Sequence, residues 1–143
     1  MMATYGELAP VVYPWEVLIS ADRTPEQAWA DWLTARLEPR GVGVFRVRSG
    51  EEALRIVRRE QIKLAVLDAR IQQMDGLGLL RRIRSINSVL PCLLVADEID
   101  ARYLKTALEL RAYSVIATPV DEDVLRELIA VVFRRFYESE MLL

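Results

Sequence analysis

Five short apolar runs divide this chain, and a segment with helical spacing of its apolar residues follows each run. The clearest run, 62–67, is apolar except for Lys63 and ends at Asp68. Apolar runs without polar alternation are typical of strands buried on both faces of a parallel sheet, because the intervening helices cover those faces. This pattern constrains the fold more than any other feature of the sequence.

The pattern predicts strands at 16–20, 42–47, 62–67, 91–96 and 114–117. Thr24 is expected to cap the first helix, with Gln27 reaching back to its amide, and Ser49 is expected to cap the second. Asp121 is expected to cap the last helix, which extends to Tyr137 or beyond. Because crossovers between parallel strands are right-handed, we predict an α/β fold with a doubly wound five-stranded parallel sheet and five helices. The flavodoxin-like order 2-1-3-4-5 is the order that we expect for this sheet.

The chain has 143 residues, which is enough for one domain with its own core. Residues 1–14 contain two prolines and a polar start, and we predict that they form an N-terminal arm. Residues 15–143 are predicted to form a single domain with an extended C-terminal helix. No second domain or internal repeat is expected.

The composition excludes several classes of function. The sequence has no histidine, which excludes His-based metal sites and Ser–His or Cys–His nucleophile pairs. Segment 20–25 after the first strand has no glycine, which argues against a phosphate-binding loop. No apolar run approaches the roughly 20 residues of a membrane span. We therefore expect a cytoplasmic protein that is not an enzyme, with no membrane partner.

Two acidic residues are predicted to share one crevice. Asp22 follows the first strand and Asp68 ends the third, and these strands are neighbours at the switch point of the predicted sheet. Two nearby carboxylates repel each other, which raises the pKa of one of them unless a cation binds. A cation site is therefore expected at this edge.

Several motifs together resemble the receiver domain of two-component response regulators over about residues 16–136. The motifs are Val-Leu-Asp at 66–68, Met-Asp-Gly at 74–76, Thr-Pro-Val at 118–120 and Ser-Gly-Glu-Glu-Ala-Leu at 49–54. The resemblance implies that a histidine kinase phosphorylates Asp68. It also implies weakly bound Mg²⁺ held by Asp22, Asp68 and the backbone carbonyl of Arg70, and a turn at Pro119 with a cis peptide bond.

Other positions depart from the family pattern. A second metal-binding acid is replaced by Ala21, a hydroxyl by Ala96, an aromatic switch residue by Val115 and a lysine by Thr118. Hydrogen bonds to a charged group contribute roughly 1.5–3 kcal/mol each, so these losses are expected to weaken a phosphorylated state by several kcal/mol. An arginine, Arg23 or Arg70, is an alternative source of the missing positive charge.

These departures predict a receiver-like signalling domain that acts as a protein-interaction module with weak or no phosphate dependence. The alternative is a conventional Mg²⁺-dependent phosphoacceptor that is phosphorylated on Asp68. The expected partners are a histidine kinase or a signalling effector. A flavodoxin-like enzyme is disfavoured, because the phosphate loop and histidine are both missing.

The last predicted helix carries more apolar residues than one sheet contact needs. The face toward the sheet is expected to contain Val124, Leu125, Leu128, Ile129 and Val132. Additional apolar surface is expected at Phe133, Phe136, Tyr137 and segment 141–143. Such a surface predicts a homodimer through helix four, strand five and helix five, or a partner helix there.

Arginines and tryptophans receive structural interpretations. The formal net charge is −2, and the arginines on the third and last helices are expected to form solvated faces rather than a nucleic-acid site. Those arginines are Arg81, Arg82, Arg84, Arg134 and Arg135. Trp29 and Trp32 are expected to pack in or beside the core.

Overall fold

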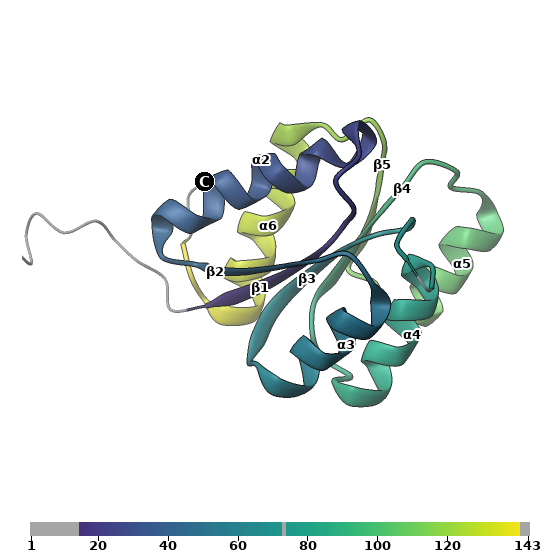
Figure 1. Cartoon of the computed structure of the whole chain (residues 1–143), viewed down its shortest axis with the longest axis horizontal. Coiled ribbons are helices and arrows are strands. Elements are labelled where there is room, and N and C mark those ends of the chain that lie inside the picture. The colour runs from purple at the N-terminus through teal and green to yellow at the C-terminus, as the bar shows by residue number, and fades with distance from the viewer. Residues whose placement is uncertain (1–14, 73, 141–143) are drawn as a thin grey trace, which may run out of the picture.

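The computed structural model describes residues 15–72 and 74–140 of the chain. One five-stranded parallel sheet in the order β2-β1-β3-β4-β5 forms its centre (Figure 1). The strands are β1 Glu16–Ser20, β2 Gly43–Val47, β3 Ile62–Asp68, β4 Cys92–Ala96 and β5 Ser114–Ala117. This order confirms the predicted flavodoxin-like fold. The predicted arm, 1–14, and segment 141–143 lie outside the described residues.

Helices cover both faces of the sheet. On one face lie α2 and α6, and on the other lie α3, α4 and α5 (Figure 1). The five helices are α2 Ala28–Leu37, α3 Gly50–Arg59, α4 Gly76–Ile86, α5 Ala101–Glu109 and α6 Glu122–Tyr137. Single 3₁₀ turns at Pro25–Gln27 (η1) and Glu38–Arg40 (η2) flank α2. The five predicted helices are all present.

Alternating side chains of the strands supply the two halves of the core. In β1, Val17 and Ile19 pack toward α2 and α6, whereas Leu18 packs toward α3 and α4. All five residues of β4 are buried, as expected for a strand with helices on both faces. The sheet is therefore a rigid base for the loops at its carboxyl edge.

Helix capping agrees with the prediction at two of three positions. Ser49 Oγ accepts from the Glu52 amide at 3.2 Å, and Asp121 accepts from two amides at the start of α6. Thr24 makes no side-chain capping bond, so that prediction was wrong. The chain enters α2 through η1, and the Gln27 amide group donates to the Arg70 carbonyl instead of reaching back to residue 24.

The predicted apolar faces of α6 need correction. Val124 is 46% exposed, whereas Phe133 is fully buried and stacks on Trp15 with ring centroids 4.8 Å apart. Tyr137 is half-buried, and its hydroxyl donates to the Lys63 carbonyl at 2.6 Å. Of the three predicted interface residues, Phe136 alone is largely exposed, at 44%. Phe133 belongs to the core because the neighbouring Trp15 ring covers it.

Arg84 is also not part of a solvated face, contrary to the prediction. Its guanidinium donates to backbone carbonyls before β4 and between α5 and β5. The acceptors are the carbonyls of Asn87, Leu90, Leu110 and Arg111. The side chain therefore joins two loops at the amino end of the sheet.

Candidate functional site

The site lies at the carboxyl edge of the sheet, after β1, β3, β4 and β5. Strands β1 and β3 are directly paired, with Ser20 opposite Leu67. This register places Asp22 and Asp68 at the same edge, as the sequence predicted. The two carboxylates nevertheless have different environments and different basic partners.

Asp68 is fully buried, and both of its carboxylate oxygens accept hydrogen bonds. Oδ1 accepts from the Arg70 backbone amide at 2.9 Å and from Arg70 Nε at 3.3 Å. Oδ2 accepts from the indole nitrogen of Trp29 at 3.2 Å. Burial of a charged group is costly without such partners, and here a cation and two neutral donors supply them.

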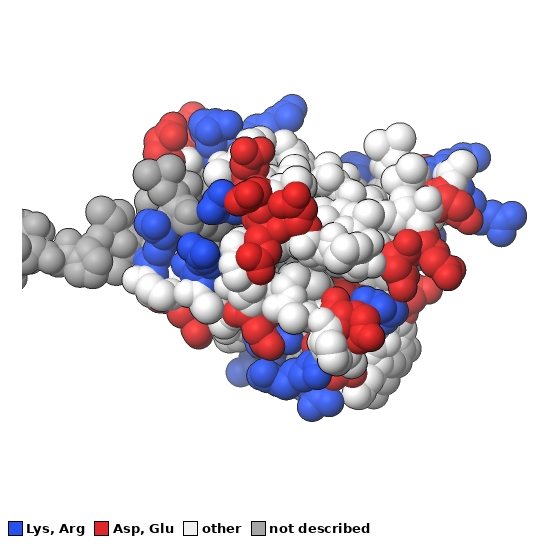
Figure 2. Space-filling view, turned by 90° about the horizontal axis from the view of Figure 1, so that it is seen from above, with Lys and Arg blue, Asp and Glu red and all other residues white. Residues whose placement is uncertain are grey.

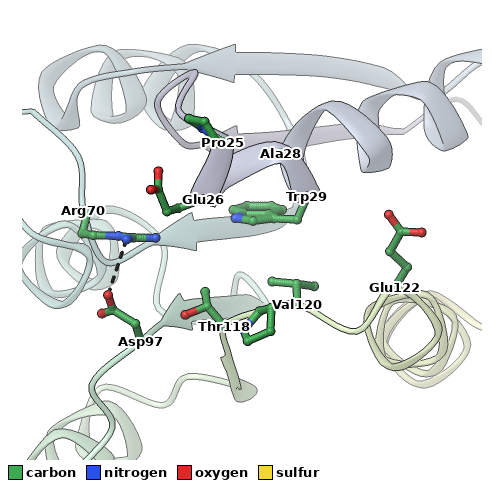
Figure 3. A pocket seen from close by; sticks show the side chains of 10 residues that line it. Pro25, Glu26, Ala28, Trp29, Arg70, Asp97, Thr118, Val120 and Glu122 are labelled. Carbon is green, nitrogen blue, oxygen red and sulfur yellow. Dashed lines mark hydrogen bonds and ion pairs between the residues drawn. The ribbon is translucent and has the colours of Figure 1, made fainter.

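Arg70 connects Asp68 with the loop after β4. Its Nη1 lies 3.4 Å from Asp97 Oδ2, and Figure 3 shows the guanidinium between the indole of Trp29 and the Asp97 carboxylate. The Arg70 side chain is 38% exposed. Its backbone carbonyl, a predicted metal ligand, accepts from Gln27 Nε2 at 3.2 Å. Arg70 therefore links the end of β3 to the segments after β1 and β4.

Asp22 is held by a second set of donors. Its Oδ1 accepts from the Arg23 amide at 2.8 Å and from Arg48 Nε at 3.0 Å. The Arg23 amide and then the Arg48 guanidinium lower the pKa of Asp22 below its ordinary value. The expected repulsion between two carboxylates is therefore not seen at Asp22, because basic residues already accompany it.

Three of the four positions that depart from the family pattern lie at the carboxyl edge of the sheet, since Ala21 follows β1, Ala96 ends β4 and Thr118 follows β5. Ala96 and Ala21 are buried and offer no polar group, and Val115 packs against the core on the α3–α5 face. Thr118 lines a cavity of about 450 Å³ together with Trp29 and Arg70 (Figure 3). The Thr118–Pro119 peptide bond is cis, as the resemblance implied.

Tyr103 of α5 lies near the same carboxylates. Its hydroxyl is buried and has no hydrogen-bond partner within the described protein atoms. Burial, and then the negative charges of Asp75, Asp68 and Asp97, raise its pKa to about 12. The ring packs against the same part of the core as Val115. An aromatic side chain is therefore present beside the site, but it comes from a helix and not from β5.

The contacts of the predicted magnesium ligands do not fit Mg²⁺. That ion requires near-octahedral oxygen ligands at about 2.0–2.1 Å. Asp22, Asp68 and the Arg70 carbonyl each accept hydrogen bonds from nitrogen donors. Within 15–72 and 74–140, no group of three or more acidic or cysteine side chains is arranged to hold a metal. Magnesium binding therefore stays a prediction of the sequence, and these contacts oppose it.

Four residues of the site were not predicted as functional. Trp29 was expected to pack, which it does, but its bond to Asp68 was missed. Buried indole N–H groups usually have an acceptor, and this rule is the signal that could have identified the bond. Gln27, Arg48 and Asp97 were also missed, because their partners come from distant parts of the chain.

The comparisons with known proteins identify the family. The family model described as the response regulator receiver domain matches residues 25–130. Transcriptional regulatory protein GlrR of Escherichia coli is 30% identical over 97 residues, which are 68% of this chain and 22% of that protein. Sporulation initiation phosphotransferase F of Bacillus subtilis is 30% identical over 87 residues, 61% of this chain and 70% of that protein. The chain belongs to the response regulator receiver domain family.

Solved structures agree on the fold. A putative response regulator from Chloroflexus aurantiacus has a TM-score of 0.73 and 26% identity, over 86% of this chain and 100% of that chain. A CheY-like receiver domain protein from Methanospirillum hungatei has a TM-score of 0.74 at 22% identity, over 87% of this chain and 98% of that chain. The chain spans about a fifth of the length of the first curated relatives that it matches.

Receiver domains take part in two-component signalling, commonly bind Mg²⁺ at the phosphorylation site, and interact with histidine kinases, phosphotransferases and effector domains. In the described part of the chain, no helix is long and apolar enough to cross a membrane. The statements about signalling, Mg²⁺ and partners hold for the family. What this particular chain does with Asp68 depends on the contacts around that residue.

Proposed function

We propose that this receiver domain is a protein-interaction module that works with little or no dependence on phosphorylation. The observation that carries the proposal is the closed arrangement of Asp68. A carboxylate attacks a phosphodonor through an oxygen lone pair that the donor can reach. Asp68 is fully buried, and each of its oxygens already accepts a hydrogen bond, Oδ1 from Arg70 and Oδ2 from Trp29.

The contacts of Arg70 also connect Asp68 to the loop after β4, a connection that phosphorylation would otherwise have to create. A ligand shifts a conformational equilibrium only through contacts that differ between the two states. Ala96 and Thr118 provide neither a hydroxyl at the end of β4 nor a cation after β5. Arg70 already joins Asp68 to Asp97 at the start of the β4–α5 loop. This connection favours one constant arrangement of that loop.

The alternative is a conventional phosphoacceptor, and one observation favours it. The Arg70 guanidinium lies beside Asp68, where a positive charge could stabilise a phosphoryl group after the side chain moves. In that case Arg70 would do the work of the missing lysine. The cost is the loss of its two carboxylate contacts and the exposure of a buried aspartate.

Incubation with Mg²⁺ and acetyl phosphate, followed by intact-mass measurement, separates the two candidates. The proposal predicts no added phosphoryl mass on the full chain, and no spectral change with beryllofluoride. Trp29→Phe and Arg70→Met are matched variants that open either side of Asp68. An adduct on the wild-type chain that disappears in Asp68→Asn would establish the conventional alternative.

The exposed apolar surface supports a proposed homodimer through α5, β5 and α6. Leu104 and Leu108 are one helical turn apart on α5 and are 48% and 75% exposed. Phe136 on α6 is exposed as well.

On the face drawn in Figure 2, basic and acidic groups are interspersed, which supports a protein partner more than nucleic acid. The proposed role is that of a cytoplasmic, non-enzymatic signalling protein.

Solution mass tests the dimer. The wild-type chain is expected to be dimeric at high concentration, and Leu108→Asp and Phe136→Asp are expected to shift it to a monomer. Arg81→Asp, at an exposed site on α4, is the matched control and should remain dimeric. A wild-type monomer at every concentration would contradict the proposed dimer without affecting the proposal about Asp68.

A further inference from the structure

Basic side chains lie within bonding distance of both Asp22 and Asp68. Arg48 Nε lies 3.0 Å from Asp22 Oδ1, and Arg70 Nε lies 3.3 Å from Asp68 Oδ1. Arg46 donates to the Asp22 backbone carbonyl at 3.2 Å. Asp22 and Asp68 are therefore accompanied by three guanidinium groups, two from the end of β2 and one from the loop after β3.

The local charges are nearly balanced without a metal ion. Arg46 also contacts Asp31 and Arg70 also contacts Asp97, so that the three arginines together face four carboxylates. An ion with two positive charges would add repulsion from each nearby guanidinium. A crevice with two carboxylates and no arginine would attract the same ion.

At Asp68, which is buried, the arrangement of the donors is specific, whereas the Arg48 side chain at Asp22 is 56% exposed. Arg70 holds Asp68 through its backbone amide and Nε and holds Asp97 through Nη1, which uses the planar fork of the guanidinium. Gln27 Nε2 bonds to the Arg70 carbonyl, and Gln27 is buried. A metal ion would have to share each of the three predicted ligands with a nitrogen donor that already bonds to it.

We infer that the guanidinium groups of Arg48 and Arg70 take the place of the divalent metal ion at this site. They neutralise the carboxylates of Asp22 and Asp68, so that the chain folds without magnesium. The inference rests on the proposed function only for the closed arrangement around Asp68. The two can fail separately. Phosphorylation without metal dependence would contradict the proposed function alone, whereas tight Mg²⁺ binding by an unphosphorylated chain would contradict this inference alone.

Calorimetric titration with Mg²⁺, and electron paramagnetic resonance with Mn²⁺ as a direct probe of free and bound ion, test the inference on the full chain. The wild-type protein is expected to show no saturable binding in the millimolar range. The double variant Arg48→Met, Arg70→Met is expected to bind Mg²⁺ saturably, with an affinity at least about tenfold above any binding by the wild-type chain, because the positive groups nearest the carboxylates are gone. Adding Asp22→Asn to that variant should abolish the gain.

The double variant Arg81→Met, Arg82→Met is the matched control. It removes the same charge from exposed positions on α4 and is expected to bind no more Mg²⁺ than wild type. Because Arg70→Met could disturb folding, Arg48→Met alone is measured as well, and circular dichroism checks each variant. Saturable Mg²⁺ binding by wild type that is lost in Asp22→Asn would overturn the inference. Failure of both folded arginine variants to gain binding would also overturn it.

Discussion

Two arginines join loops at opposite ends of the sheet, and they do so with different partners. At the amino end, Arg84 donates to backbone carbonyls in the loops before β4 and before β5. At the carboxyl end, Arg70 donates to the side-chain carboxylates of Asp68 and Asp97. Both side chains are partly buried, so burial does not distinguish them.

The difference lies in what the partners can do. A backbone carbonyl neither ionises nor changes rotamer, so the contacts of Arg84 last as long as the loops remain folded. A carboxylate carries a charge and can rotate, so the contacts of Arg70 depend on side-chain charge and conformation as well as on the fold of the loops. The contacts of Arg84 at the amino end therefore hold two loops together. The contacts of Arg70 at the carboxyl end are between charged side chains, which is the type of contact on which a signalling site depends.

The largest expected effect on stability is at Arg84, at the amino end of the sheet. Arg84→Met keeps the aliphatic part of the side chain but leaves carbonyls of two loops without their donor. Since hydrogen bonds to charged groups contribute about 1.5–3 kcal/mol each, and water replaces some of them, the free energy of unfolding should fall by about 2–4 kcal/mol. Urea unfolding measures this change. Arg81→Met is the control and should change stability by less than about 0.5 kcal/mol.

A smaller effect is expected at Arg70. Arg70→Met leaves Asp68 with its bonds from Trp29 and from the residue 70 amide, and the lost side chain was 38% exposed. The free energy of unfolding should therefore fall by about 1–2 kcal/mol, which is less than for a deeply buried pair. In the Asp68→Asn background the loss should shrink, because the charge that Arg70 neutralises is gone.

The comparison between the two ends would fail if Arg70→Met cost more stability than Arg84→Met. It would also fail if Arg70→Met had the same cost in the wild-type and Asp68→Asn backgrounds, since the carboxylate would then contribute nothing to the contact. Arg23→Met is the control for the loss of an exposed arginine near the site. It should leave the unfolding curve almost unchanged.

The sequence predicted the fold because periodicity reports burial directly. The runs at 16–20 and 114–117 were predicted with the bounds that the structure has. Handedness predicted a doubly wound sheet, and the flavodoxin-like order chosen for it is the order observed. The placement of Asp22 and Asp68 at one edge is a consequence of strand register. These features depend on backbone topology, which a single sequence encodes strongly.

The partners of Asp68 could not be predicted in the same way. Trp29 precedes Asp68 by 39 positions, and its indole reaches the carboxylate only because η1 sets the start of α2. The helical spacing of Trp29 correctly indicates packing but says nothing about where the N–H points. Arg84 shows the same limit, since its position in a helix suggests solvent while its acceptors lie in two distant loops.

Phenol ionisation gives the finest test of the comparison. Tyr103 lies at the Arg70 end, and burial followed by the charges of Asp75, Asp68 and Asp97 raises its pKa to about 12. Tyr137 lies at the amino end of β3, where burial, and secondarily Cys92, raises its pKa to about 12. In both cases the folded value exceeds the ordinary value of 10, so the stabilisation is complete below pH 10 and is lost as pH rises toward 12.

Replacing Asp97 by asparagine removes a negative charge from the environment of Tyr103 and none from that of Tyr137. The pKa of Tyr103 is therefore expected to fall by a fraction of a unit, while that of Tyr137 stays the same. Phenolate absorbance followed above about pH 10, with Tyr103→Phe and Tyr137→Phe used to assign the two transitions, measures both values. Equal shifts at both tyrosines would mean that the charge acts through the whole domain rather than through the carboxylates around Arg70.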